Sequence, residues 1–208
     1  MHKGRLEAFS DGVLAIIITI MVLELHAPHE DATLSALRPL VPILLSYILS
    51  FIYVGIYWTN HHHMLQASNH VTGGALWANL HLLFWLSLIP FSTGWIGQTH
   101  FAAIPMAIYG ANLLLAAIAY SILVHALIRS HGRESTLAAA IGRDRKGNLS
   151  LLLYALGIAL ACRWRWVALG IYSAVALIWL VPDTRIERVM EHRENGSDPA
   201  PARQHERV

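Results

Sequence analysis

Between residues 32 and 133 the sequence contains neither aspartate nor glutamate, and its long apolar runs are separated only by short polar breaks. Hydrophobic residues make up 55% of the chain and charged residues only 13%, whereas soluble domains carry roughly 25% charged residues. A helix needs about 20 predominantly apolar residues to cross a bilayer. A chain of 208 residues can therefore hold five or six spans and no sizeable aqueous domain.

Local helix breakers divide the apolar sequence into six predicted transmembrane helices. Pro28 follows the first run, Gly73 and Gly74 separate the second from the third, and Pro105 opens the fourth. The predicted fold is thus an all-α integral membrane protein with one six-helix domain over residues 1–182. A charged and polar segment, 183–208, is predicted to be a disordered cytoplasmic tail. The six predicted helices cover residues 4–25, 36–66, 74–97, 104–129, 147–163 and 166–182.

The distribution of basic residues predicts the orientation in the membrane. Cytoplasmic loops collect Lys and Arg, and 12 of the 15 Lys and Arg residues share one side if both termini are cytoplasmic. The exceptions are Arg38, Arg163 and Arg165. We therefore expect an even number of spans with both ends in the cytoplasm. A net charge of only +2 gives no reason to expect a nucleic-acid partner.

The first predicted helix, within RLEAFSDGVLAIIITIMVLEL, carries two distinct faces. Ile16, Ile20 and Leu23 are spaced i, i+4, i+7 and form one narrow apolar stripe, with Thr19 on its flank. Asp11 points away from this stripe. A charged group inside the bilayer costs at least a few kcal/mol, so we expect protein neighbours for Asp11 on the opposite face. From the pattern alone the stripe fits ordinary packing, lipid contact or a pore lining.

Polar residues of the second and third predicted helices are the candidate neighbours. The segments IYWTNHHHM and LWANLH reach a similar depth to Asp11 if the first three helices form an antiparallel bundle. We expect a hydrogen-bonded network there, with Arg5 or His61 as the partner of Asp11. The network could simply fix helix packing, or it could also bias a gate through histidine protonation near neutral pH. Its candidate members are Arg5, Ser10, Asp11, Asn60, His61, His62, Asn79 and His81.

Three stretches of this sequence resemble a known family. The opening RLEAFSD has an R-x-x-x-F-S-D pattern that leads directly into an apolar helix, and it resembles the signature of the transmembrane protein 175 family of potassium channels, specifically its bacterial members. The stretches IYWTNHH and NLHLLFWLSLIPFSTG are similar to further elements of that family. The resemblance covers about the first 100 residues, and the last three predicted helices agree only in number and hydrophobicity.

This resemblance implies a potassium-selective channel in the bacterial plasma membrane, a homotetramer around a central pore lined by the first helix. It implies that Ile16 forms the narrowest point, that Ile20 and Leu23 form further apolar rings, and that Thr19 belongs to a hydroxyl layer associated with potassium preference. The partners are then K⁺ ions, other subunits and the lipid bilayer, without a cofactor. The chain has no TVGYG-like loop, so selectivity would not come from a carbonyl filter. The implied anchor of the pore helix comprises Arg5, Phe9, Ser10, Asp11, His61 and Asn79.

Two other functions are compatible with the residues alone. A membrane metalloenzyme could use histidine ligands, which are His61, His62, His63, His70 and His81. Adjacent histidines on a helix point about 100° apart, however, and no carboxylate lies among them. A secondary transporter would need polar groups near the bilayer midplane and often internal repeats, and the motif has no second copy. We therefore predict no enzyme activity and no bound metal.

Overall fold

The computed structural model describes residues 3–27, 33–68, 70–131 and 144–180. All regular secondary structure in these ranges is helical, which confirms the all-α prediction for this part of the chain. The predicted tail 183–208 and residues 132–143 of the basic link lie outside the described residues. The helices are α1 (Lys3–Leu23), a 3₁₀ helix (Leu34–Leu40), α2 (Val41–Gln66), α3 (Gly73–Ser87), α4 (Ile89–Gln98), α5 (Ala103–His131), α7 (Arg145–Ala161) and α8 (Arg165–Leu180).

The third predicted helix is divided into α3 and α4 at Leu88, where the sequence had indicated one continuous span. Pro90 has no backbone N–H and cannot bond to the carbonyl four residues earlier, so the regular helical ladder is interrupted. The side chain of Asn112, on α5, compensates for this break. In the amide orientation that pairs donors with acceptors, its nitrogen donates to the Trp85 carbonyl at 2.9 Å and its oxygen accepts from the Ile89 N–H at 3.2 Å.

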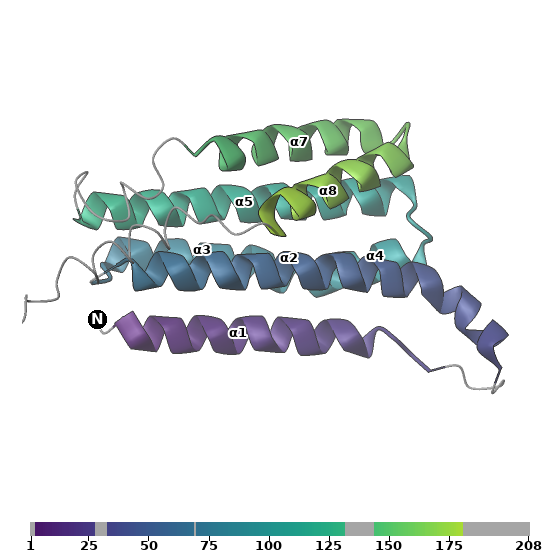
Figure 1. The fold of residues 1–208 in the computed structure, drawn as a ribbon, viewed down its shortest axis with the longest axis horizontal. Coiled ribbons are helices and arrows are strands. Elements are labelled where there is room, and N and C mark those ends of the chain that lie inside the picture. The colour runs from purple at the N-terminus through teal and green to yellow at the C-terminus, as the bar shows by residue number, and fades with distance from the viewer. Residues whose placement is uncertain (1–2, 28–32, 69, 132–143, 181–208) are drawn as a thin grey trace, which may run out of the picture.

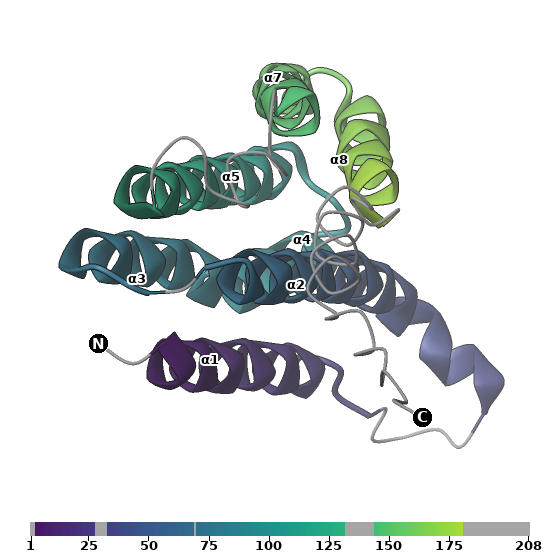
Figure 2. The ribbon, with the colours of Figure 1, turned by 60° about the vertical axis from the view of Figure 1, so that its left-hand side comes forward.

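The helices form layers, with α1 on one side of the molecule and α7 and α8 on the other (Figures 1 and 2). Helix α1 packs against α2, α3 and α4, whereas α7 packs against α5 and α8. Two groups of buried apolar side chains result. The α1-side core joins α1, α2, α3 and α5, and the α8-side core joins α2, α5, α7 and α8. Helices α2 and α5 therefore contribute to both cores.

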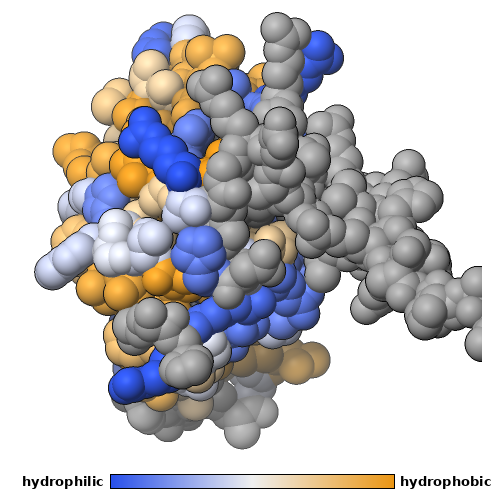
Figure 3. All heavy atoms as spheres, turned by 90° about the vertical axis from the view of Figure 1, so that its left-hand side faces the viewer, coloured by the Kyte–Doolittle hydropathy of each residue, from blue (hydrophilic) through white to orange (hydrophobic). Residues whose placement is uncertain are grey.

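The outer surface of the helices is strongly apolar. Leu23, Trp77 and Leu152 are among many large hydrophobic side chains left exposed, and such surface on an isolated chain marks lipid or protein contact. At the end of the bundle where α1 begins, hydrophilic side chains gather beside hydrophobic ones (Figure 3). In the described part of the chain four helical segments are long and apolar enough to cross a membrane, namely Lys3–Leu23, Leu34–Gln66, Gly73–Gln98 and Ala103–Ser130.

Candidate pore helix and its polar anchor

Helix α1 buries one face and leaves the other without a partner inside the subunit. Leu14, Ile17 and Met21 are exposed by 3% or less. In contrast, Ile16 is 58% exposed and Leu23 70% exposed. The apolar stripe predicted from the sequence, with Ile20 between these two residues, therefore coincides with the uncovered face of α1.

Thr19 lies on this uncovered face, beside the stripe. Its hydroxyl donates to the carbonyl oxygen of Ile16 at 2.9 Å, one turn back along the same helix. A hydroxyl has one donor and two acceptor lone pairs. Because the hydrogen is used within the helix, the hydroxyl oxygen is left to face outward as an acceptor.

Three buried polar side chains connect α1, α3 and α2 in one chain of hydrogen bonds. The Ser10 hydroxyl donates to the Leu6 carbonyl at 2.8 Å and accepts from the Asn79 amide nitrogen at 3.0 Å. The Asn79 oxygen lies 2.7 Å from Nε2 of His61. Since the amide oxygen can only accept, Nε2 carries the hydrogen. The other ring nitrogen of His61, Nδ1, is buried with no hydrogen-bond partner among the described residues.

A second connection between α1 and α2 uses acidic side chains. Asp11 accepts from the indole N–H of Trp58 at 3.0 Å, and Glu7 lies 3.2 Å from Nδ1 of His62. The rings of Trp58 and His62 stack, with centroids 6.1 Å apart. Each helix thus presents residues one turn apart, and the two pairs form consecutive rungs between the helices.

The structure brings together only part of the set expected from the sequence. Ser10, His61 and Asn79 meet, but Asp11 bonds to Trp58 and not to Arg5 or His61. Asp11 is rotated by about 100° from Ser10 on the helix, so it faces α2 rather than the buried chain. Arg5 and Phe9 are exposed on the same face as the stripe, outside this network.

Two other candidate side chains form hydrogen bonds within their own helices. The Asn60 amide donates to the Ile56 carbonyl at 2.8 Å, and His81 accepts from the indole of Trp85 at 2.9 Å. The sequence analysis missed Trp58 as a partner. The signal that could have revealed it was its indole N–H, a donor four residues before His62 in the segment expected at the depth of Asp11.

The opposite end of α1 is also held by a side-chain hydrogen bond. Gln98, the last residue of α4, donates to the Glu24 carboxylate at 2.8 Å. That carboxylate lies against Gly94, where an added Cβ would come within 3.0 Å of Oε2. Polar contacts therefore fix both ends of α1 to the rest of the subunit.

The α8-side core is built differently, around Tyr172 of α8. This side chain is fully buried and fits into a notch between Gly110 of α5 and Gly157 of α7. A Cβ atom at either glycine would collide with the Tyr172 ring or hydroxyl. The Tyr172 carbonyl in turn accepts from the Tyr53 hydroxyl at 2.6 Å. Absent side chains at the two glycines thus allow three helices to approach closely.

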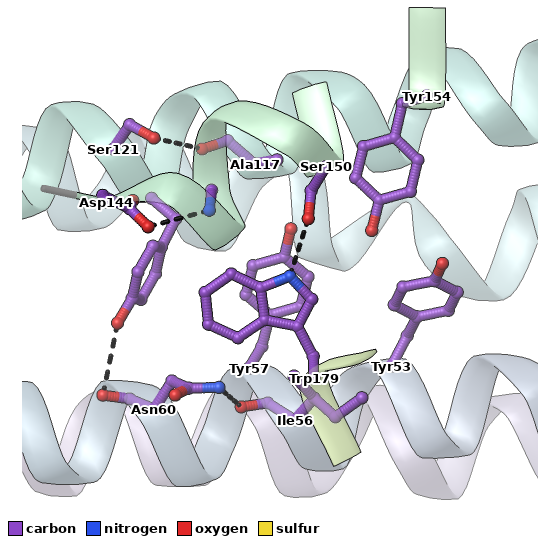
Figure 4. A pocket seen from close by; sticks show the side chains of 12 residues that line it. Tyr53, Ile56, Tyr57, Asn60, Ala117, Ser121, Asp144, Ser150, Tyr154 and Trp179 are labelled. Carbon is purple, nitrogen blue, oxygen red and sulfur yellow. Dashed lines mark hydrogen bonds between the residues drawn. The ribbon is translucent and has the colours of Figure 1, made fainter. Parts of the chain in front are cut away.

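A cavity of about 40 Å³ lies beside this core, between α2, α5, α7 and α8. Aromatic side chains including Tyr53, Tyr154 and Trp179 surround it, and the Trp179 indole donates to the Ser150 hydroxyl at 2.8 Å (Figure 4). The volume suits a few water molecules. Because the cavity lies on the far side of α2 from α1, we assign it to the packing of the C-terminal helices and not to the uncovered stripe.

Comparisons with known proteins agree with the resemblance in the sequence. The family described as "Endosomal/lysosomal potassium channel TMEM175" matches residues 5–90. A potassium channel from a Chryseobacterium species is 56% identical over 191 residues, covering 92% of this chain and 99% of the relative. A potassium channel from Streptomyces collinus is 30% identical, covering 86% of this chain and 91% of the relative.

A solved structure shares the fold. It is the crystal structure described as a lysosomal potassium-selective channel TMEM175 homolog from Chamaesiphon minutus. It superimposes with a TM-score of 0.76 at 27% sequence identity, covering 87% of this chain and 97% of that chain. The overlap with the Chryseobacterium relative extends the match beyond the first three helices, to 92% of this chain. The chain described above therefore belongs to the TMEM175 family of potassium channels.

Proposed function

We propose that four copies of this chain form a potassium-selective channel in a bacterial plasma membrane, with α1 of each subunit lining a central pore and both termini in the cytoplasm. The observation that carries this proposal is the uncovered apolar face of α1, a helix whose other face is packed and whose two ends are anchored. The names of the bacterial relatives and of the matching crystal structure support potassium as the permeating ion.

In this proposal Ile16, Ile20 and Leu23 form successive apolar rings on the pore axis. Apolar constrictions can stop conduction by dewetting, so the closed state needs no further plug. Thr19 lies between these rings with its oxygen lone pairs turned outward, because its hydrogen is bonded to Ile16. Oxygen atoms of this kind replace part of the hydration shell of a cation, which supports Thr19 as the residue that favours K⁺.

The alternative functions receive no comparable support. No group of three His, Cys, Asp or Glu side chains in the described ranges is placed to hold a metal ion. Of the five clustered histidines, His61 bonds to Asn79 across two helices, and His81 bonds to Trp85 within its own helix. The whole-chain relatives carry the name of a channel and not of a carrier.

Single-channel recording from purified protein in planar bilayers tests the proposal. Cysteine is introduced singly at positions 16, 20 and 23, and at the buried control positions 17 and 21, in a background where Cys162 is replaced by serine. Thiol reagents added from the aqueous phase should block the first group and leave the controls conducting. Equal block at all five positions, or none at position 16, would contradict the pore-lining assignment.

Replacement of Ile16 by asparagine gives a second test of the same point. The amide hydrogen-bonds to water and should keep the constriction wet, so open probability should rise and discrimination between K⁺ and Na⁺ should fall. The same replacement at Ile17, which is 3% exposed, should impair folding without this change in conduction. The assembly is checked by mass measurement in mild detergent, where a monomer or dimer under all conditions would contradict a tetramer.

A further inference from the structure

The segment called here the α7–α8 turn, which comprises the end of the turn and the first two residues of α8, carries two arginines and two tryptophans in alternation, and all four are exposed. They are Arg163, Trp164, Arg165 and Trp166. The Arg163 guanidinium carbon lies 5.8 Å from the ring centre of Trp164, and that of Arg165 lies 5.4 Å from the ring centre of Trp166. These residues line a groove of about 300 Å³ together with Ala103 at the start of α5. Each guanidinium is therefore held beside an aromatic ring at the rim of a concave surface.

Neither guanidinium has an anionic partner within the described residues. All four acidic side chains in these ranges are engaged elsewhere, Glu7 with His62, Asp11 with Trp58, Glu24 with Gln98, and Asp144 with the backbone N–H of Gly147. Each arginine presents five N–H donors in a planar fork that matches a phosphate group. Two such forks lie two residues apart in this segment, and no carboxylate of the described ranges neutralises them.

The position of the turn in the bundle indicates which part of the membrane the two guanidinium groups face. It is at the end of the bundle where α1 finishes (Figure 1), and it belongs to the layer farthest from α1 (Figure 2). A tryptophan side chain with an apolar body and a polar N–H favours the boundary between lipid tails and headgroups. The two guanidiniums beside these rings then lie at the depth of the lipid phosphates.

We propose that Arg163 and Arg165 bind the phosphate of an anionic phospholipid, of the phosphatidylglycerol class, with Trp164 and Trp166 seated in the interface beside it. The charge of the turn selects an anionic lipid, because a zwitterionic headgroup brings its own cation against two uncompensated guanidiniums. This site also accounts for two arginines on the side opposite most of the basic residues. It rests on the α7–α8 turn alone and stands independently of the pore proposal.

Native mass spectrometry of the full chain in mild detergent tests this site. The protein is mixed with equal amounts of dioleoylphosphatidylglycerol or dioleoylphosphatidylcholine, and the bound lipids are counted. The unmodified protein should retain more of the phosphatidylglycerol. The double variant Arg163→Gln, Arg165→Gln should lose at least about tenfold in its affinity, because charge-assisted contacts to phosphate are strong. Unmodified protein with no preference between the two lipids would overturn the proposal by itself.

A matched control removes the same charge at the opposite end of the bundle. The double variant Arg129→Gln, Arg145→Gln replaces two exposed arginines there and should keep the preference for phosphatidylglycerol. If both double variants lose this preference equally, the effect is one of general charge and the site is contradicted. The variant Arg163→Lys, Arg165→Lys keeps the charge without the fork and should bind with intermediate affinity. If inorganic phosphate raises the melting temperature as much as phosphatidylglycerol does, the ligand is a free anion and the lipid assignment is wrong.

Discussion

The two sides of α2 are held together by different kinds of interaction. On one side, α1 packs one face into an apolar core. It is also attached by separate side-chain hydrogen bonds, from Asn79 to Ser10 and from Gln98 to Glu24, and by the two rungs through Trp58 and His62. On the other side, α5, α7 and α8 meet at Tyr172, which fills a notch made by two glycines. Discrete polar contacts can break and reform one at a time, whereas interlocked packing is lost only as a whole. The comparison indicates that the α1 side depends in part on individual polar contacts, whereas the C-terminal side depends on the fit of one ring between two glycines.

The largest expected effect comes from filling the glycine notch. Gly157→Val places its branches where the Tyr172 ring lies, so α7 and α8 must separate and the α8-side core must open. Overpacking typically costs about 1–3 kcal/mol and occasionally more, and we expect the upper end here because two helices must shift. Melting temperature in detergent, followed by tryptophan fluorescence, measures the loss. Gly170→Val on α8 is the control, since nothing lies within 4 Å of a Cβ there. A similar fall in melting temperature in the control would show that the notch has no special role in stability.

Breaking the buried polar chain should have the next largest effect. Asn79→Leu removes both hydrogen bonds of its amide and leaves Ser10 and His61 to be satisfied elsewhere. An unsatisfied buried polar group costs about 1–3 kcal/mol, so stability should fall by about 2 kcal/mol. Ser10→Ala should lower stability less in the Asn79→Leu background than in the unmodified protein, because the partner of Ser10 is already lost there. Strictly additive losses would show that the two side chains are not coupled.

The contact between Asp11 and Trp58 should contribute less, because it is partly open to solvent. Trp58→Phe keeps an aromatic ring beside His62 but removes the N–H donor, and we expect a loss of about 1 kcal/mol. In an Asp11→Ala background the same replacement should have almost no further effect. If Trp58→Phe is as destabilising in that background as in the unmodified protein, Trp58 contributes to stability through its ring and not through its N–H donor.

The smallest expected effect is at the hydroxyl of Tyr172. This group lies 3.5 Å from the Met106 carbonyl, at the limit for a hydrogen bond. Tyr172→Phe keeps the ring that fills the notch, so stability should change by about 0.5 kcal/mol or less. Tyr172→Ala, which empties the notch, should cost several times more. If the phenylalanine variant is as unstable as the alanine variant, the α8-side core depends on a hydrogen bond and the contrast between the two sides fails.

The sequence predicted those features that the membrane itself imposes. The apolar runs located the helices because a span must be long and apolar, and the similar depth of Ser10, His61 and Asn79 indicated their meeting. The rotation of α1 about its axis relative to α2 is set by packing across helices, so periodicity did not reveal that Asp11 faces Trp58. Pro90 was visible in the sequence, but the amide that satisfies the backbone at the interruption belongs to Asn112, on another helix.

The glycine notch was also missed, for a different reason. Glycine is frequent in transmembrane helices generally, so Gly110 and Gly157 looked unremarkable within apolar runs. Their role becomes visible only when Tyr172, far along the chain, is placed between them. Partner choice between distant helices is therefore the information that a single sequence does not supply.

The bond between Ser10 and Asn79 has a consequence for how the protein is made. The two residues are 69 positions apart, and α2 lies between them in the chain. Helix α1 leaves the ribosome first. Its acidic side chains find their partners on α2, but Ser10 has no interhelical partner until α3 has been synthesised. The buried hydrogen-bond chain through Ser10 thus closes only after α3 is present, later than the contacts between α1 and α2 can form. Biogenesis of this protein is therefore a process in which the third helix completes the placement of the first.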